Sequence, residues 1–295
     1  MAGPSEPKTR RPAVAGRFYP DDPEECRSEA QRYLSACASA PNKRWVGAIA
    51  PHAGWICSGA VAGEAISTLA MAGPADVVVL FGAVHTPIHT TRGVLDSHPR
   101  WSLPSGHSDQ AMELHPLLTA APDTFVVDDR FHQHEHAIEV ELPLVQQAFP
   151  KAKVLPIEVP AVEEAVSIGR ETARRLAKAG VKATYVASTD FTHYGPGYRF
   201  TPAGLGLRAL EWAKDNDRRL LHLIEQLAAE RVIGEVNVRV NACGGGAVAA
   251  VLSACREMGA TSGVVLRHTN SYETLARVAP QTPESAVGYA AVAIG

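Results

Sequence analysis

An uninterrupted apolar run, Val77–Phe81, is the feature that most limits what this chain can fold into. Strands that carry apolar side chains on both faces are typical of parallel sheets covered by helices on both sides. Similar runs occur at Trp45–Ala50, Lys153–Val159 and Ala183–Ser188, and segments of helical composition separate them. The sequence therefore predicts an α/β fold with a mostly parallel or mixed sheet and helices on both faces.

The other predicted elements follow from cap residues and from apolar periodicity. Asp22 and Pro23 suit the N-cap and first position of a helix that would run to about Ala38. Val162–Ala179 carries one apolar face, and the glycine that follows suits a C-terminal cap. The remaining predictions are helices over 58–71, 137–148, 207–231 and 244–258, and strands over 76–82, 263–268 and 287–294.

Length and composition narrow the class of protein. The chain has 295 residues, of which 46% are apolar, enough for the core of one full-sized domain. A formal net charge of −3 provides no basic field for nucleic acid. No apolar run approaches the roughly 20 residues of a membrane span, and no export signal is recognisable. We expect a cytoplasmic protein with a disordered tail over residues 1–11 and a single domain over residues 12–295.

Reactive side chains follow several predicted strands. His52 and His85 come just after two of the apolar runs, and Asp190 and His193 come after a third. In open α/β sheets, ligands bind beyond the carboxyl ends of the strands. Imidazoles delivered there are good ligands for iron, copper and zinc, so the sequence predicts a shared metal site. Taken singly, each histidine has a simpler interpretation as a hydrogen-bonded structural residue.

Cys243 stands apart from the other cysteines. The five cysteines are an odd number without a CxxC pair, which favours reduced thiols in a reducing compartment. Cys243 directly precedes three glycines and the predicted helix over 244–258. A thiol at a helix N-terminus has a lowered pKa, which favours the thiolate. The alternative is a small buried hydrophobe before a flexible turn.

A histidine-rich stretch contains His132, His134 and His136. If the stretch is a strand, its three imidazoles share one face and could bind zinc together. The alternative is a polar rim beside an acidic helix start, with Glu135, Glu139 and Glu141 expected to be supporting or surface groups. The chain has no glycine-rich phosphate loop and no GxSxG motif, so nucleotide and serine-hydrolase chemistry are not indicated.

An ordered set of short segments, spread over residues 12–294, resembles the Memo family, which includes the B component of the bacterial AmmeMemoRadiSam system. No single segment is decisive, but their order along the chain is specific. The segments are Pro12–Pro20, Ala50–Gly54, Gly82–His85, Glu135–Pro143, Ser188–Gly195, Ala242–Gly244 and Val287–Ala291.

The resemblance implies a particular site. The fold of this family resembles the catalytic subunit of class III extradiol dioxygenases, which use non-haem iron. By motif, His52, His85 and Cys243 would hold a mononuclear transition metal, with His193 as general acid/base and Asp190 beside it. In the dioxygenases the third ligand is a carboxylate. A thiolate suits copper or zinc at least as well, so the expected order is Fe2+, then copper, then zinc.

The expected function is therefore that of a metal-dependent oxidoreductase, similar to a dioxygenase, that acts on a small aromatic molecule. One alternative is a non-catalytic module of the Memo type that binds metal or peptide. Another is a metal-free role for Cys243 as a nucleophile beside His193. The resemblance implies radical SAM and other AmmeMemoRadiSam proteins as partners besides the small-molecule substrate, and a homo-oligomer is a further expectation.

Overall fold

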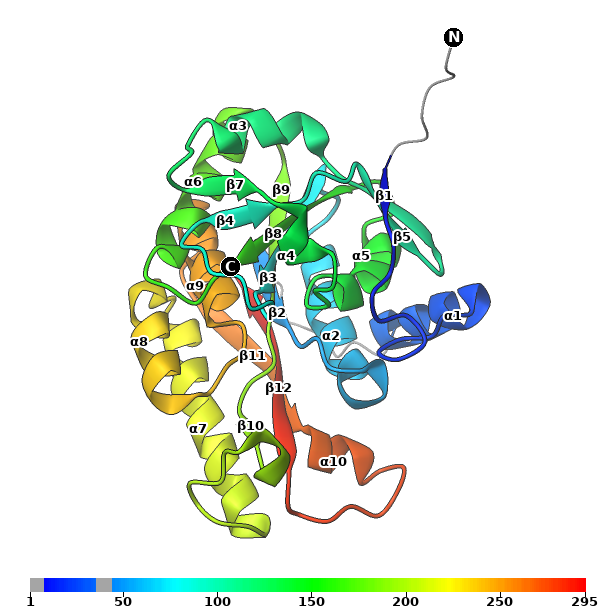
Figure 1. The fold of residues 1–295 in the computed structure, drawn as a ribbon, viewed down its shortest axis with the longest axis vertical. Coiled ribbons are helices and arrows are strands. Elements are labelled where there is room, and N and C mark those ends of the chain that lie inside the picture. The colour runs from blue at the N-terminus through cyan, green and yellow to red at the C-terminus, as the bar shows by residue number, and fades with distance from the viewer. Residues whose placement is uncertain (1–7, 36–43) are drawn as a thin grey trace.

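A mixed sheet forms the centre of the protein (Figure 1). The computed structural model describes residues 8–35 and 44–295, and within them the sheet has nine strands. The strands are β2 (Gly47–Ala50), β3 (Val77–Ala83), β4 (Gly93–Leu95), β7 (Phe125–Val127), β8 (Lys153–Val159), β9 (Ala183–Ser188), β10 (His193–Tyr194), β11 (Gly263–Asn270) and β12 (Ala286–Ile294). Their order is β10-β12-β2-β9-β3-β8-β4-β7, and β11 also pairs with β12.

The middle of the sheet is parallel, as predicted. β2 pairs with β9, and β3 pairs with both β9 and β8, all in parallel. β12 and β4 join this block antiparallel, next to β2 and β8. Ala50 at the end of β2 lies opposite Ser188 at the end of β9. The carboxyl ends of β2, β9 and β3 therefore meet at one edge of the sheet, where the site residues were expected.

Helices cover both faces of the sheet (Figure 1). One face carries α1 (Pro23–Ser35), α2 (Trp55–Ala70) and α5 (Leu142–Ala148). The other carries α6 (Ala165–Lys178), α7 (Leu207–Glu225), α8 (Ala229–Arg239) and α9 (Gly245–Glu257). The shorter helices are η1 (Met112–Leu114), α3 (His115–Thr119), α4 (Asp129–His132), η2 (Glu139–Glu141), η3 (Pro196–Tyr198) and α10 (Ser271–Leu275).

Strand β3 shows why an uninterrupted apolar run is needed. All seven of its residues are buried. Val77, Val79 and Phe81 belong to the core under α6 and α9, whereas Val78 and Leu80 belong to the core under α2. Because alternate side chains point to opposite faces of a strand, one run fills both cores. The predicted α/β architecture with helices on both faces is confirmed.

Two predicted helices have different bounds in the structure. The helix expected over 137–148 is a 3₁₀ turn, η2, followed by α5, which begins at Leu142. Pro143 lies in the first turn of α5, where its missing N–H costs no hydrogen bond. Helix α1 ends at Ser35, and the predicted residues 36–38 lie outside the described residues.

The predicted disordered tail is wrong at its C-terminal end. Residues Thr9–Arg10 form β1, which pairs in parallel with β5 (Arg100–Leu103), and β5 pairs with β6 (Gly106–Asp109). The Arg10 guanidinium is buried and bonds to Glu139 Oε2 at 2.7 Å. A polar segment gives no hydrophobic signal, so the sequence did not reveal this interaction. Residues 1–7 lie outside the described residues.

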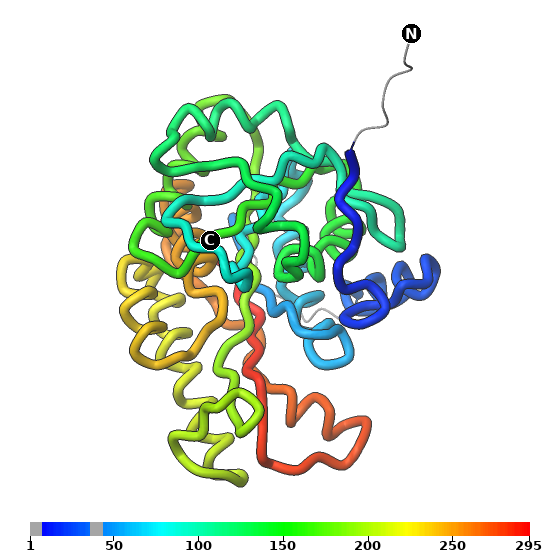
Figure 2. Tube along the Cα trace, viewed as in Figure 1, coloured from blue at the N-terminus to red at the C-terminus, as the bar shows by residue number. Residues whose placement is uncertain are grey.

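Segments far apart in sequence lie side by side in this fold. Figure 2 traces the chain from its blue N-terminal part to the red strand β12. Although β12 is the final strand, it pairs with β2 near the other end of the chain. β1 likewise pairs with β5 across about a third of the chain's length. The site described below depends on such long-range pairings.

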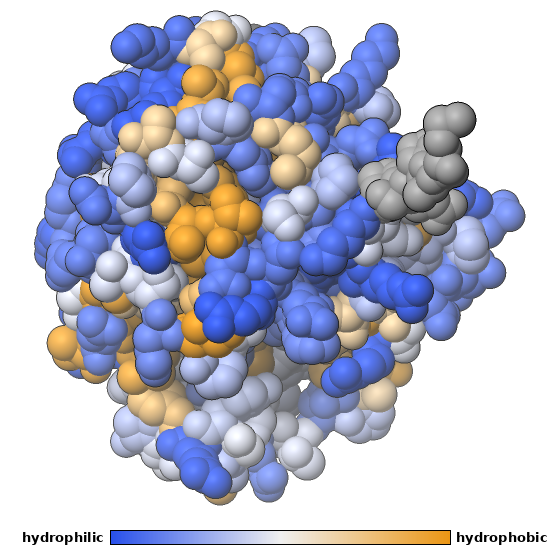
Figure 3. Space-filling view, turned by 45° about the horizontal axis from the view of Figure 1, so that its top comes forward, coloured by the Kyte–Doolittle hydropathy of each residue, from blue (hydrophilic) through white to orange (hydrophobic). Residues whose placement is uncertain are grey.

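Among the described residues, no helix combines the length and apolar composition needed to cross a membrane. The face shown in Figure 3 is largely hydrophilic, and its apolar side chains stand among hydrophilic ones. Exposed large apolar residues include Ile56 in α2 and Val238 in α8, which belong to different faces of the fold. Scattered apolar side chains of this kind are usual on protein surfaces.

Candidate metal centre

His52 lies two residues beyond β2 and is almost completely buried. Its main-chain N–H donates to Asp190 Oδ1 at 2.9 Å. Its Nδ1 lies 2.9 Å from Ser188 Oγ, and that hydroxyl donates to the Ala137 carbonyl at 2.6 Å. Since the hydroxyl proton is used there, Ser188 accepts from His52 Nδ1–H. The unprotonated nitrogen of the neutral imidazole is then Nε2, which lies 3.3 Å from Cys243 Sγ.

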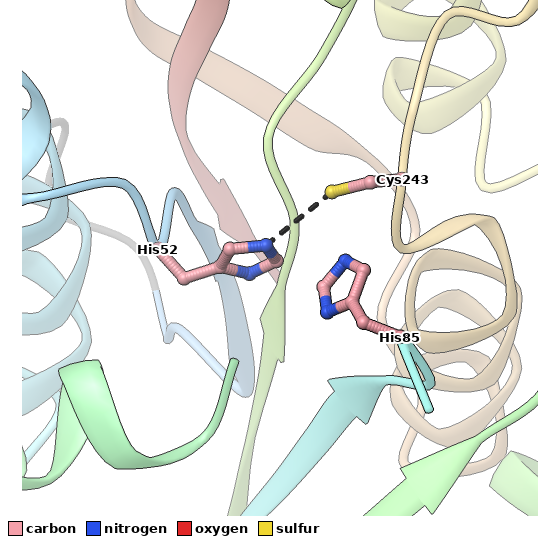
Figure 4. A group of neighbouring side chains, drawn as sticks. All are labelled: His52, His85 and Cys243. Carbon is pink, nitrogen blue, oxygen red and sulfur yellow. Dashed lines mark hydrogen bonds between the residues drawn. The ribbon is translucent and has the colours of Figure 1, made fainter. Parts of the chain in front are cut away.

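His85 lies two residues beyond β3 and is held by Glu135 in a similar way. Its Nδ1 is 2.9 Å from Glu135 Oε1, and its main-chain N–H donates to Glu135 Oε2 at 2.7 Å. A carboxylate only accepts, so Nδ1 carries the proton and Nε2 is left as the ligating nitrogen. Figure 4 shows the His85 ring turned toward His52 and Cys243.

Cys243 comes from the loop before α9, with Gly244 as the N-cap residue. Its Sγ accepts from the Asp190 main-chain N–H at 3.3 Å, while Gly244 N–H donates to Thr189 Oγ1 at 2.9 Å. A Cβ on Gly244 would lie 2.7 Å from the Ser188 carbonyl oxygen, so only glycine allows this close approach. The loop thereby brings the thiol against the end of β9.

The three side chains form one cluster. One ligand atom from each of His52, His85 and Cys243 lies within 4.8 Å of the other two. They come from three separate segments and point toward a common centre (Figure 4). Such convergence of two imidazoles and a thiol is what a small transition-metal site requires. The structure brings the three predicted ligands together.

The side chains of the cluster shift one another's pKa values. Burial alone would raise the pKa of the Cys243 thiol, but the charge of His52, its hydrogen bond to the thiol and the nearby imidazoles of His193 and His85 hold it well below its usual value. Burial would lower the pKa of His52, yet the charges of Cys243 and Asp190 raise it to about 9. A metal ion that binds here must displace protons from the imidazoles, so its affinity depends on pH.

Asp190 and His193 lie beside the cluster with different contacts. Asp190 is buried, and its Oδ1 accepts from the main-chain N–H groups of His52 and Ala53. Its Oδ2 is 3.9 Å from His193 Nε2, which is too long for a hydrogen bond. His193 Nε2 has no hydrogen-bond partner in residues 8–35 and 44–295. Asp190 thus positions the His52 loop, and the His193 ring lies next to Tyr198 with centroids 5.0 Å apart.

Glu135 and Ser188 are the supporting residues of the site. Glu135 was expected to be a supporting or surface group, and the structure buries it between His85 and His136. Burial alone would raise its pKa, but hydrogen bonds from the two histidines hold the pKa well below the usual range. The sequence pattern alone does not predict a role for Ser188. The one indication in the sequence is that Ser188 is the last residue of a predicted strand. In the structure that strand, β9, pairs with β2, which leads to His52.

The histidines of the histidine-rich stretch lie in three different environments. His132 is buried and its Nε2 donates to the Val94 carbonyl at 3.1 Å. His134 is exposed. The His136 ring lies beside the candidate metal centre, with centroid distances of 4.9 Å to His85 and 5.2 Å to His52. Of the two interpretations of this stretch, the shared zinc site is wrong, because α4 and a bend replace the strand that would have aligned the three histidines.

Burial of His132 predicts a pH-dependent stability. Burial lowers its pKa to about 4, whereas unfolded histidine titrates near 6.5. As the pH falls from about 6.5 to 4, the unfolded state gains a proton that the folded state excludes, so stability declines. This histidine should account for up to about 3 kcal/mol of that decline. In urea unfolding, the free energy of unfolding of His132→Gln should depend less on pH than that of the wild type. His134→Gln, at an exposed site, is the control and should follow the wild type. If the free energy of unfolding changes equally with pH in all three proteins, the assignment to His132 is wrong.

Fold and side chains together define an α/β protein with a candidate transition-metal centre at the carboxyl edge of its sheet. The family model described as Memo-like protein matches residues 10–293. A MEMO1 family protein of Methanosarcina barkeri is 32% identical over 289 residues, covering 97% of this chain and 99% of that protein. One from Thermococcus kodakarensis is 31% identical over 298 residues, covering 96% and 98%. The chain belongs to the Memo family, which confirms the resemblance.

Proposed function

We propose that this protein binds one transition-metal ion through His52, His85 and Cys243 and uses it to oxidise a small aromatic molecule. The observation that carries the proposal is the convergence of the three ligand atoms within 4.8 Å. The Nδ1 atoms of both histidines are already bonded to Ser188 and Glu135, which leaves each Nε2 for the ion. Outer hydrogen bonds of this kind are usual for histidines that bind metals.

The donor set fits a first-row ion. Two imidazoles and one thiolate suit iron, copper and zinc, and we propose Fe2+ first, copper second and zinc third. When bound, the ion would supply redox and Lewis-acid chemistry. A protein ligand set of three leaves room for a substrate to bind beside them.

His193 and Tyr198 would contact the substrate, whereas Asp190 would act indirectly. The His193 side chain is partly exposed and its Nε2 makes no hydrogen bond with the described residues, so it can transfer a proton to or from a bound molecule. Asp190 would act on the reaction through the His52 loop that it fixes. The half-exposed Tyr198 ring beside His193 offers an apolar face to an aromatic substrate.

The thiolate supports a second candidate function. A soft sulfur ligand with a lowered pKa favours tight holding of copper(I) or zinc. A thiolate beside an ion that activates oxygen is also open to oxidation. A non-catalytic protein that binds and retains metal is therefore the alternative to the enzyme.

Oxygen uptake should separate the two functions. The iron-loaded protein is expected to consume oxygen with catechol, and His193→Gln should lower the rate by about 10²–10⁴-fold without changing the metal content. His222→Gln, at an exposed residue in α7, is the matched control and should retain full activity. Tight binding of catechol without oxygen uptake, for iron and copper alike, would favour the metal-holding protein.

Partners and compartment remain proposals that follow from the family. We propose radical SAM and other AmmeMemoRadiSam proteins as partners, and self-association as a further property. Cys26, Cys57, Cys243 and Cys255 are free thiols in the described chain. Free thiols are compatible with a reducing cytoplasm, where we place the protein.

A further inference from the structure

Two neighbouring polar residues of α7, Asn216 and Asp217, are almost completely buried. Neither belongs to the cluster around Cys243. Buried polar side chains need hydrogen-bond partners, and the partners of a buried pair show what the pair holds in place. Here the partners lie in the two loop segments, 190–193 and 239–243, that carry residues of the candidate metal centre.

Asp217 holds the segment that leads to His193. Its Oδ1 accepts from the main-chain N–H of Thr192 at 2.9 Å, and its Oδ2 lies 3.1 Å from His268 Nε2. A Cβ on Gly288 would overlap Asp217 Oδ2, so only glycine lets β12 pack this closely against the carboxylate. Gly288 in turn donates its N–H to the Thr192 carbonyl at 3.0 Å. Thr192 is therefore fixed from both α7 and β12.

Asn216 reaches both segments at once. Its Nδ2 donates to Thr192 Oγ1 at 3.1 Å and to the Arg239 carbonyl at 3.0 Å. Its main-chain carbonyl accepts from Asn241 Nδ2 at 2.9 Å. Val240, between these two partners, has a φ of 53°, which a β-branched residue rarely adopts. Such a conformation persists only where surrounding contacts hold it, and Asn216 supplies contacts on both sides.

The two segments also contact each other beside the thiol. Phe191 forms an antiparallel bridge with Ala242. The Asp190 carbonyl accepts from the Cys243 N–H at 3.2 Å, and the Asp190 N–H donates to Cys243 Sγ at 3.3 Å. The His193 imidazole is among the groups that lower the pKa of the Cys243 thiol. A shift of one segment against the other would therefore change the surroundings of the thiol.

We propose that Asn216 and Asp217 are positioning residues that join the 190–193 and 239–243 segments into one rigid unit. A buried polar network whose members are satisfied makes the attached loops rigid. The chemical consequence rests on the proposed function, because a fixed relation between Cys243 and His193 matters only if both act at one centre. The joining of the two segments does not depend on that function.

Hydrogen–deuterium exchange of the metal-free, full-length protein tests the joining. In Asn216→Ala and in Asp217→Ala, the main-chain N–H groups of Cys243 and Gly244 should exchange about ten- to a hundredfold faster than in the wild type. Peptides over 78–82 in β3 should exchange as in the wild type, because a local loosening leaves the middle of the sheet intact. Two alanine variants are used so that the failure of one to fold leaves the test valid.

Two conservative variants complete the set. Asp217→Asn keeps an oxygen that can accept from the Thr192 N–H, so it should exchange within about twofold of the wild type. Asp215→Asn removes a charge at an exposed position of the same helix and is the matched control, with wild-type exchange expected. Wild-type exchange at Cys243 in both alanine variants, or equally faster exchange in β3, would overturn the proposal.

Zinc affinity, measured by competition with a chelator, tests the positioning of the site. Asn216→Ala and Asp217→Ala should each bind Zn2+ about tenfold more weakly than the wild type, although every proposed ligand is intact. Asp215→Asn should bind like the wild type. Unchanged affinity in both alanine variants would overturn the positioning role. A wild type that binds no zinc, iron or copper would instead overturn the metal centre of the proposed function, and hydrogen exchange alone would then decide whether α7 joins the two segments.

Discussion

Alanine in place of His52 is expected to abolish stoichiometric binding of iron or copper. The change removes the most deeply buried of the three proposed ligands, and two remaining donors cannot complete the site. The loss of affinity should exceed the roughly hundredfold that removal of an outer hydrogen-bonding partner causes. Metal content of the purified protein, measured by mass spectrometry after dialysis, checks this expectation.

A second measurement keeps this test informative if the variant is less stable. In the wild type, one equivalent of metal should protect Cys243 from alkylation by iodoacetamide, and His52→Ala should lose that protection. His222→Ala, at an exposed histidine in α7, should bind and protect like the wild type. If His52→Ala retains full metal content, the ligand assignment is wrong. If metal never protects Cys243 in the wild type, a metal-free thiol nucleophile becomes the better interpretation.

Methionine in place of Arg10 is expected to lower the free energy of unfolding by about 3–5 kcal/mol. The Arg10 and Glu139 side chains form an ion pair that is almost completely excluded from water. Removal of the cation leaves a buried carboxylate without its countercharge. Arg10 also donates to the carbonyls of His132 and Glu135, and those groups would lose their partner. Urea unfolding of both proteins, compared at the transition midpoint, measures the effect.

Arg100→Met provides the control for Arg10→Met. Arg100 lies in β5, next to β1, and pairs with Asp109 on an exposed surface. Its loss should cost at most about 1 kcal/mol. In a double variant, Glu139→Gln should recover part of the stability lost in Arg10→Met, since it removes the unpaired charge. Equal losses for Arg10→Met and Arg100→Met would mean that the buried pair contributes no more than a surface pair.

The sequence predicted best those strands whose formation depends on residues close together in the chain. β8 and β9 have the bounds expected from their apolar runs. The positions of His52 and His85 followed from one rule, that parallel strands bring their carboxyl ends to the same edge. That rule needs only the strands and their direction, so the approximate place of the site was predictable without a structure.

What the sequence did not reveal depends on contacts between distant polar residues. Arg10 and Glu139 are separated by 129 positions, and neither lies in an apolar pattern. Ser188 and Glu135 fix the histidine rings through geometry that exists only after the strands have paired. β4, β5, β6 and β7 have only three or four residues each, which is too short for a periodicity to emerge.

Arg10 has a practical consequence for anyone who prepares this protein. Its guanidinium donates to the main chain of Glu135 at 2.6 Å, and the carboxylate of Glu135 fixes His85 at the candidate metal centre. A tag, a shortened gene or a protease cut that disturbs the strand around Arg10 would therefore weaken metal binding at the proposed site while every proposed ligand stays intact. Preparations that differ only at the N-terminus should be compared for metal content before their activities are compared.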